Sequence, residues 1–338
     1  MIKIGKIYIM RRQGVSRLCA DISIGRKRST LWFAVDRAHE PFLCGNRADA
    51  FVMALLPTAI RGRHEIICEN FMSERLQYQL NEYLIPALIS NRADLKFVQI
   101  HAPMVKEKYT NCGAIGTVFS GDAESLYTVM KHGRKCEYPL THIAVFNIEA
   151  TSGIRDWYKL KNNCYQAEKL AKEQNLKFIC VDTNIYKVFH ENMAEVCSFR
   201  KIACIFALQG LFSIFLLPAQ YDAANFKLDS LNAARYELLT ANCASTESLL
   251  LYCDGGEANH YEKLKALTEW ETSWHWLHSC INKSTGSYNC GHCISCTRDL
   301  TIFYKLKRLE CYQDVFKIKK FGFLTRILSG IKKIRGFI

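Results

Sequence analysis

The sequence predicts an α/β fold with a parallel sheet and helices on both faces. From about residue 116 onward, short apolar runs alternate with amphipathic stretches of helical length. This alternation is typical of parallel strands joined by crossover helices. The runs are continuously apolar, which indicates strands buried on both faces. A chain of 338 residues that is 49% hydrophobic can bury the large core that such a sheet requires.

The strands and helices of this sheet follow from the order of these runs. Sheets of this kind bind ligands at the carboxyl ends of their strands, where the strand order reverses. The segment SGDAES follows the first run, so we expect it at the binding edge. Strands are predicted at 115–119, 141–148, 176–182, 212–218 and 248–254, with helices at 123–132, 157–174, 193–209 and 230–243.

Residues 1–110 have a different pattern and are predicted to form a separate α+β domain. KIGKIYIMRR, RLCADISI and TLWFAVD are predicted strands at hairpin spacing. DAFVMALLPTAIR and SERLQYQLNEYLIPALI are predicted helices, and LKFVQIHAP is a further predicted strand. The α/β domain is predicted to cover residues 111–315, and residues 316–338 are predicted to form a basic amphipathic tail.

The SGDAES turn combines small residues with two acids. Ser120 and Gly121 end a predicted strand, and a helix follows, an arrangement suited to phosphate binding. Asp122 and Glu124 place negative charge at the same point. Three interpretations remain open. The acids recruit a divalent metal in a rearranged loop, the loop has lost triphosphate binding, or Asp122 caps the helix with Glu124 in its first turn.

Four cysteines near the end of the chain have the spacing of a metal site. Cys280, Cys290, Cys293 and Cys296 form a C-x9-C-x2-C-x2-C pattern. A two-residue spacer lets both sulfurs reach one tetrahedral Zn²⁺, and four thiolates leave no open position for water. The sequence therefore predicts a structural zinc knuckle, with Gly291 in its tight turn. An iron–sulfur cluster and uncoordinated thiols remain alternatives.

The other cysteines suggest a reducing compartment. Most of the 16 cysteines stand singly inside apolar runs, which is typical of buried free thiols in the cytoplasm. The apolar segment at residues 202–219 is long enough to span a bilayer. Because Gln209, Gly210 and Pro218 interrupt it, we expect a buried helix followed by a buried strand. The predicted location is cytoplasmic, with a peripheral membrane position left open.

The turn and the cysteines together resemble the N-type ATP pyrophosphatases, whose fold is adenine-nucleotide α-hydrolase-like. More narrowly, residues 112–300 resemble the QueC-like branch, the 7-cyano-7-deazaguanine synthases and their relatives. CGHCISC with the outlying Cys280 matches the zinc signature of that branch. Arg298 lies two residues past the last cysteine instead of three. Asn259, His260 and Glu262 loosely match its S-[KR]-x-E helix start. The N-terminal extension resembles that of longer relatives, some of them encoded in antiphage or surface-polysaccharide loci.

The resemblance implies an ATP-dependent carbon–nitrogen ligase. A carboxylate such as 7-carboxy-7-deazaguanine would attack the α-phosphorus of ATP, and ammonia or an amine on a macromolecule would then displace AMP. Magnesium would accompany ATP. A homodimer remains open, and the alternative is a degenerate relative that acts as a non-catalytic scaffold. The implied ATP-binding residues are Ser120, Gly121, Asp122, Ala123, Glu124 and Ser125, with Ser120, Glu124 and Ser125 as the catalytic set.

Two of these residues depart from the family pattern. Asp122 replaces the second glycine of the loop, and this puts a carboxylate where a polyanion would lie against bare backbone. Glu124 is one methylene longer than the Asp that the family places there. An extra carboxylate beside a triphosphate is repulsive unless Mg²⁺ lies between them.

The charge of the chain suggests further partners. The formal net charge is +13, and the last 22 residues carry seven basic residues and no acid. Apolar residues recur there at near-helical spacing, which is typical of a helix that lies on an anionic membrane or binds nucleic acid. Docking of this helix on the protein itself is equally open. A nucleic-acid-associated factor is therefore a third functional hypothesis, and it rests on charge alone.

Overall fold

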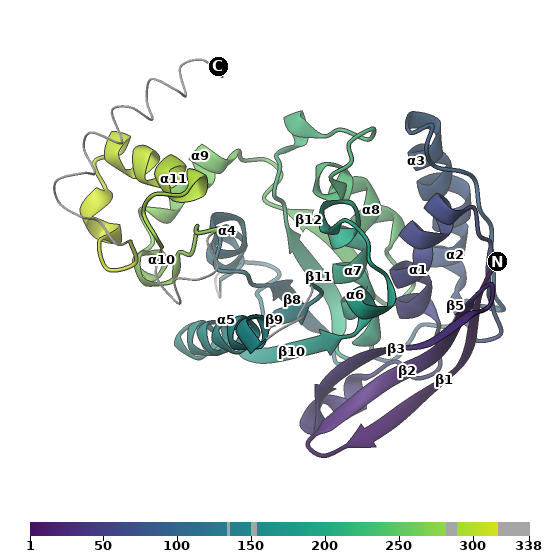
Figure 1. Ribbon diagram of the computed structural model, residues 1–338. Helices are drawn as coiled ribbons and strands as arrows, with labels where there is room; N and C mark the ends of the chain where they lie inside the picture. Colours follow the sequence, from purple (N-terminus) through teal and green to yellow (C-terminus); the bar gives the residue numbers. More distant parts are fainter. Residues whose placement is uncertain (134–135, 150–153, 282–288, 317–338) are drawn as a thin grey trace.

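The computed structural model describes residues 1–133, 136–149, 154–281 and 289–316. Strands between Ile2 and Asp254 form one ten-stranded, mostly parallel sheet, in the order β12-β11-β8-β9-β10-β3-β2-β1-β4-β6 (Figure 1). The predicted α/β class and the mostly parallel sheet are confirmed.

Five of the strands are parallel and lie close to their predicted ranges. Their order along the sheet is fifth, fourth, first, second and third in the chain. Connections therefore leave in opposite directions from the first and fourth strands, β8 and β11, and the switch point lies between them. The five strands are β8 (Ala114–Val118), β9 (His142–Asn147), β10 (Lys177–Thr183), β11 (Phe212–Pro218) and β12 (Leu250–Asp254).

Helices cover both faces of this part of the sheet. Successive side chains of β9 point to opposite faces of the sheet, and both faces are apolar. Ile143 and Val145 belong to one hydrophobic cluster, and Ala144 between them belongs to another. On the face of Ile143 lie α4 (Ala123–Lys131) and α5 (Ile154–Glu173), and on the other lie α7 (Met193–Ala207) and α8 (Glu237–Cys243). The predicted helix at 230–243 is a 3-10 turn, Ala233–Tyr236, followed by α8.

The N-terminal part begins with three antiparallel strands joined by tight turns. Gly14 and Gly25 have positive φ angles of 69° and 58° in these turns, a conformation that favours glycine. The predicted strand LKFVQIHAP is paired only at β6. The strands are β1 (Ile2–Arg12), β2 (Val15–Ile24), β3 (Lys27–Asp36), β4 (Ile66–Cys68) and β6 (Ile100–His101), with a separate pair, β5 (Met72–Ser73) and β7 (Met104–Val105).

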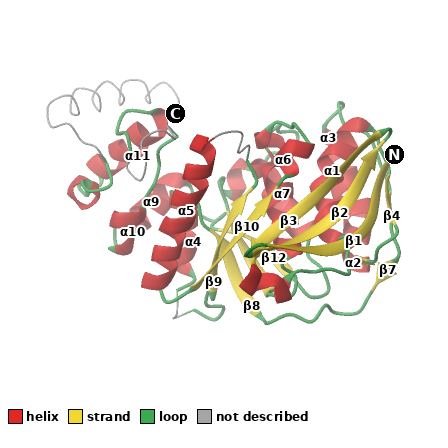
Figure 2. Cartoon of the chain, turned by 60° about the horizontal axis from the view of Figure 1, so that its bottom comes forward, coloured by secondary structure: helices red, strands yellow, loops and turns green. Residues whose placement is uncertain are grey.

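The helices of this part pack behind the strands. The largest, α1 (Asp49–Gly62), packs against α7 of the parallel part, as Figure 2 shows. The predicted helix that begins at Ser73 is divided by a π-helical turn. It consists of α2 (Glu74–Gln79), the π turn η2 (Leu80–Leu84) and α3 (Ile85–Asn91).

The sheet runs without a break across the predicted domain boundary at residue 110. Strand β3 pairs antiparallel with β10, with Ala34 opposite Asp182 and Phe33 opposite Thr183. One hydrophobic cluster contains residues from both sides of the boundary. The division into domains at residue 110 stays a prediction, and the two parts share a sheet and a core.

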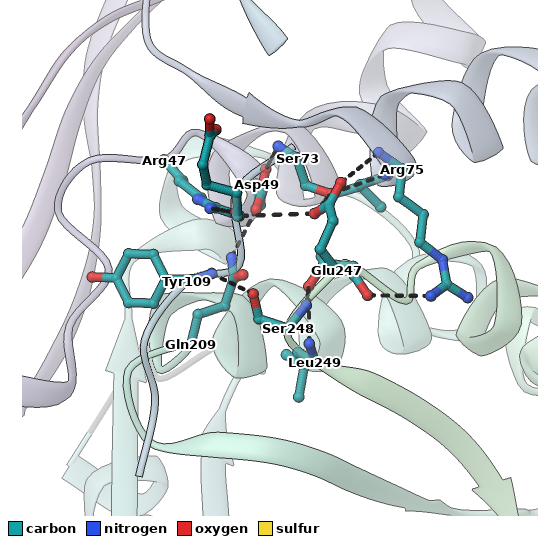
Figure 3. A network of polar contacts seen from close by, with 12 residues as sticks. Arg47, Asp49, Ser73, Arg75, Tyr109, Gln209, Glu247, Ser248 and Leu249 are labelled. Carbon is teal, nitrogen blue, oxygen red and sulfur yellow. Dashed lines mark hydrogen bonds and ion pairs between the residues drawn. The ribbon is translucent and has the colours of Figure 1, made fainter. Parts of the chain in front are cut away.

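A buried polar cluster adds a second connection between the two parts (Figure 3). Glu247, just before β12, accepts hydrogen bonds from Ser73 Oγ at 2.7 Å and from the backbone N–H of Arg75 at 2.8 Å. The Nη1 atom of Arg47 lies 3.9 Å from Glu247 Oε2. Arg47 is 5% exposed, so its charge depends on this carboxylate for compensation.

Asp49 belongs to the same cluster and is fully buried. Its carboxylate accepts hydrogen bonds from Ser73 N at 3.0 Å and from Gln209 Nε2 at 2.8 Å. Burial raises the pKa of Asp49 to about 6, although both hydrogen bonds act in the opposite direction. We call Arg47, Asp49, Ser73, Gln209 and Glu247 the joint cluster.

The C-terminal helices pack on the α4 face of the sheet, where Figure 1 shows them beside α4. They are α9 (His260–Leu267), α10 (Thr272–Trp276) and α11 (Ile294–Lys305), followed by a 3-10 turn, Leu309–Tyr312. The apolar segment 202–219 divides into the end of α7, a turn and β11, as predicted. Among the residues that the structure describes, no helix is both long and apolar enough to cross a membrane.

Candidate functional site

The SGDAES turn lies at the carboxyl end of β8, beside the switch point. Gly121 has a φ of +80°, and a β-carbon there would lie 3.1 Å from His278 Cβ. The carbonyl oxygen of Gly121 accepts a hydrogen bond from His278 N at 2.7 Å. The segment before the cysteines therefore packs directly on the turn, and only glycine fits this position without strain.

Asp122 caps helix α4. Its Oδ1 accepts a hydrogen bond from Ser125 N at 2.9 Å, and Ser125 Oγ donates to the carbonyl of Asp122 at 3.1 Å. Ser120 Oγ lies 3.4 Å from Ser125 Oγ, so the two hydroxyls predicted to bind phosphate are neighbours. The N-terminus of α4 is the position where a phosphate would bind, and the carboxylate of Asp122 now lies there. The helix-cap interpretation describes this arrangement.

Glu124 contacts the C-terminal helices through a histidine. His260 Nδ1 lies 2.8 Å from Glu124 Oε1, and His260 Nε2 lies 2.8 Å from Asp299 Oδ1. Asp299 is 1% exposed, and Arg298 Nε lies 2.9 Å from the same oxygen. We call Glu124, His260 and Asp299 the His260 bridge. It joins the starts of α4 and α9 to α11.

The charges within the His260 bridge follow from its geometry. Burial alone would lower the pKa of His260, but the hydrogen bonds to Asp299 and Glu124 outweigh it and raise that pKa to about 9. Burial would raise the pKa of Asp299, yet His260 and Arg298 bring it below its ordinary value. At neutral pH the bridge is an imidazolium between two carboxylates. One carboxylate oxygen of Glu124 is thus already hydrogen-bonded to His260.

The four predicted metal ligands come together in one buried group. The Sγ atoms of Cys280, Cys290, Cys293 and Cys296 all lie within 4.8 Å of one another, with 4.0 Å from Cys290 to Cys296 and from Cys280 to Cys293. Four sulfurs at about 2.3 Å from one tetrahedral Zn²⁺ would be about 3.8 Å apart. Cys293 N donates to Cys290 Sγ, and Gly291 has a φ of +73°. This group could hold a metal ion such as zinc.

Asn289 holds the group in place, a role that was not predicted from the sequence. Its side-chain oxygen accepts from Ser279 N at 2.8 Å and Cys280 N at 3.0 Å, and its nitrogen donates to Leu277 O at 2.9 Å and Val315 O at 3.0 Å. Asn289 is fully buried. The only signal in the sequence was its position directly before the predicted ligand Cys290. The role could not be predicted from this position, because its hydrogen-bond partners lie at residues 277–280 and 315.

A small pocket opens between α5 and the segment that covers the turn. Its volume is about 40 Å³, whereas a nucleotide-sized ligand needs roughly 300 Å³ or more. A nucleotide phosphate approaching Gly121 from this side therefore requires the segment 275–278 to move. The pocket is lined by Phe119, Ser120, Gly121, Asn162, Asn163, Gln166, His275, Trp276, Leu277 and His278.

A buried lysine and a half-buried lysine lie near the switch point, and neither was predicted. Lys263, 1% exposed, donates to the carbonyl of Ala219 just past β11 at 2.6 Å. Lys201 Nζ lies 3.3 Å from Glu237 Oε1. Burial alone would lower the pKa of Lys201, but Glu237, and to a smaller extent Asp122, raise it above the ordinary value. Neither lysine stood out in the sequence, because Arg200 directly precedes Lys201 in α7 and Lys265 follows Lys263 in α9.

Polar residues at other strand ends have structural partners. At the end of β10, Thr183 Oγ1 donates to Trp32 O at 2.7 Å and Asn184 Oδ1 accepts from Trp32 N at 2.9 Å, which fixes β3 to the sheet. At the end of β12, Asp254 accepts from Thr128 Oγ1 at 2.8 Å and pairs with Lys131 at 3.0 Å. These contacts hold β3 and α4 in place.

Comparisons with known proteins returned no relative. No family model matches the chain, and neither the curated proteins nor the solved structures yielded a match.

Proposed function

We propose that the protein is an ATP-dependent ligase of the QueC-like kind, which adenylates a carboxylate and joins it to nitrogen. One observation carries the proposal. The turn at 120–125 lies at the switch point of the parallel strands, and the His260 bridge ties it to the helix that begins at the four-cysteine group. The two motifs that carry the resemblance are thus connected through side-chain contacts.

The residues around the turn have distinct proposed roles. The hydroxyls of Ser120 and Ser125 bind phosphate oxygens, and the positive charges of Lys201 and Lys263 favour an anion at the switch point. Asp122 must leave the α4 N-terminus when a phosphate binds there. Magnesium bound with ATP would neutralise phosphate charge beside Asp122 and Glu124. Zinc in the four-cysteine group has a structural role, because four thiolates leave no open position.

The proposal is tested by ATP binding and pyrophosphate release. With Mg-ATP and 7-carboxy-7-deazaguanine, the zinc-loaded full chain should release pyrophosphate, and ammonia or an amine should be consumed. Ser120→Ala should lower the rate by tenfold or more, roughly the effect of losing one phosphate contact. Ser90→Ala, an exposed serine on α3, is the matched control and should leave the rate unchanged. Full turnover by Ser120→Ala would contradict the assignment of the turn.

A second function is favoured by the contacts of the two acids. Asp122 caps α4 and Glu124 belongs to the His260 bridge, so both carboxylates already have partners in the protein. This supports a non-catalytic binding or scaffold protein on the same fold. Calorimetry with Mg-ATP on the wild type and on Asp122→Gly separates the two functions. Binding by the wild type supports the ligase. If only the glycine variant binds, the activity was lost at this residue, and if neither binds, the scaffold is favoured.

The nucleic-acid and membrane hypotheses depend on the tail, and residues 317–338 lie outside the described part of the chain. Deleting these residues and measuring retention on anionic vesicles and on RNA tests both hypotheses. Unchanged retention on both would remove the tail from either function.

A further inference from the structure

Two cysteines on neighbouring elements lie in direct contact. The Sγ of Cys164, on α5, is 3.2 Å from the Sγ of Cys180, in β10. Both side chains are half-buried, so small oxidants can reach them. A disulfide requires the sulfurs to be about 2.05 Å apart, so the two atoms need to approach by about 1.2 Å. Helix α5 packs directly on β10, so the two thiols lie on elements that are already in contact.

The two thiols have different reactivity. Contact with Cys180 lowers the pKa of Cys164, because the Cys180 thiol stabilises the Cys164 thiolate. The same contact and burial raise the pKa of Cys180. Cys164 is therefore the better nucleophile, and Cys180, in contact with it, is in position to resolve the product.

We propose that Cys164 and Cys180 are a thiol modification site, which peroxide or a small disulfide oxidises to a reversible cross-link between α5 and β10. With hydrogen peroxide, the Cys164 thiolate displaces hydroxide from the oxidant and becomes a sulfenic acid. The Cys180 sulfur then attacks the Cys164 sulfur, and its proton leaves with hydroxide as water. Two thiols lose two hydrogens, and one peroxide is reduced to two waters.

A cross-link between Cys164 and Cys180 would also affect the pocket beside Gly121. Asn162, Asn163 and Gln166 line the pocket beside Gly121, and Cys164 lies between them on α5. A covalent bond at Cys164 would fix this amide-lined wall to the sheet. Oxidation should therefore restrict movement of α5 relative to β10, whether or not the turn binds ATP.

Peptide mapping tests the proposal. The zinc-loaded, reduced full chain is treated with hydrogen peroxide or oxidised glutathione, free thiols are blocked, and the digest is analysed without reduction. We expect a peptide cross-linked between Cys164 and Cys180 that dithiothreitol removes. The midpoint of thermal unfolding should rise by a few degrees on oxidation, because the bond restricts the unfolded chain.

Variants make the outcome decisive. Cys164→Ser and Cys180→Ser should each abolish the cross-link and the rise in midpoint. Cys197→Ser, a half-buried cysteine on α7, is the matched control and should keep both. If one serine variant misfolds by circular dichroism, the other decides. Recovery of Cys164 and Cys180 as blocked thiols, or cross-links confined to Cys280–Cys296 after zinc loss, would overturn the proposal.

Discussion

Asp122 and Glu124 stand two positions apart in one turn and have different partners. Asp122 satisfies a backbone N–H within its own helix, whereas Glu124 pairs with His260, which is far away in the chain. Local rules of helix capping therefore explain the first acid, and tertiary contacts explain the second. The ATP-binding set predicted at 120–125 stays a prediction. Whether these residues bind ATP depends on how readily the Asp122 side chain leaves the N-terminus of α4.

Replacing His260 should change stability in a pH-dependent way. Because its folded pKa, about 9, is above the ordinary value, the stabilisation is complete below about pH 6.5 and is lost as pH rises through 9. His260→Gln should lower the free energy of unfolding by about 2 kcal/mol at pH 6.5 and by much less at pH 9.5. Urea unfolding at both pH values measures this. His190→Gln, at an exposed position, is the matched control for the substitution itself.

Asp49 should affect the stability of the protein in a lower pH range than His260 does. Its folded pKa is raised to about 6, so the folded state favours the protonated form, and stability falls as pH rises from about 4 to about 6. Asp49→Asn removes this loss, and Gln209 can turn its amide to accept from the new side chain. The variant should therefore gain up to about 3 kcal/mol relative to wild type between pH 4 and pH 7. An equal difference at both pH values would contradict the burial argument.

At the scale of elements, the sequence predicted the parallel strands well and the site only in part. Continuous apolar runs mark strands buried on both faces, so the β8–β12 ranges lie close to prediction. The His260 bridge was not predictable, since Glu124, His260 and Asp299 come from three helices whose packing the local pattern does not specify. The pairing of β3 with β10 was missed for the same reason.

The affinity of the four-cysteine group for zinc should depend on Asn289. Asn289→Asp removes two donated hydrogen bonds and adds a negative charge beside four thiolates, so zinc affinity should fall by roughly 10–100-fold. The wild type should contain about one zinc per chain, measured by metal analysis and by competition with a chromophoric chelator. Asn91→Asp, at the exposed end of α3, is the control. Unchanged affinity in Asn289→Asp would show that the hydrogen bonds do not position the ligands.

At the scale of the whole molecule, the N-terminal part should not fold alone. A fragment of residues 1–110 exposes the edge of β3 that pairs with β10 and the face of α1 that packs on α7. It also leaves Arg47 without Glu247. We expect this fragment to be insoluble or unfolded by circular dichroism, and the full chain to unfold in one transition. A folded, soluble fragment would support the predicted boundary at residue 110.

The His260 bridge couples the binding of a metal ion by the four cysteines to the binding of an anion at the turn. Helix α11 begins at a cysteine of the metal group and carries Asp299, and the bridge reaches Glu124 on the turn. If an anion binding at the turn shifts Glu124, it changes the affinity of the cysteines for their ion by some factor. The ion must then change the affinity for the anion by the same factor. The group of four thiolates would thus help to set the affinity of a site that it never touches.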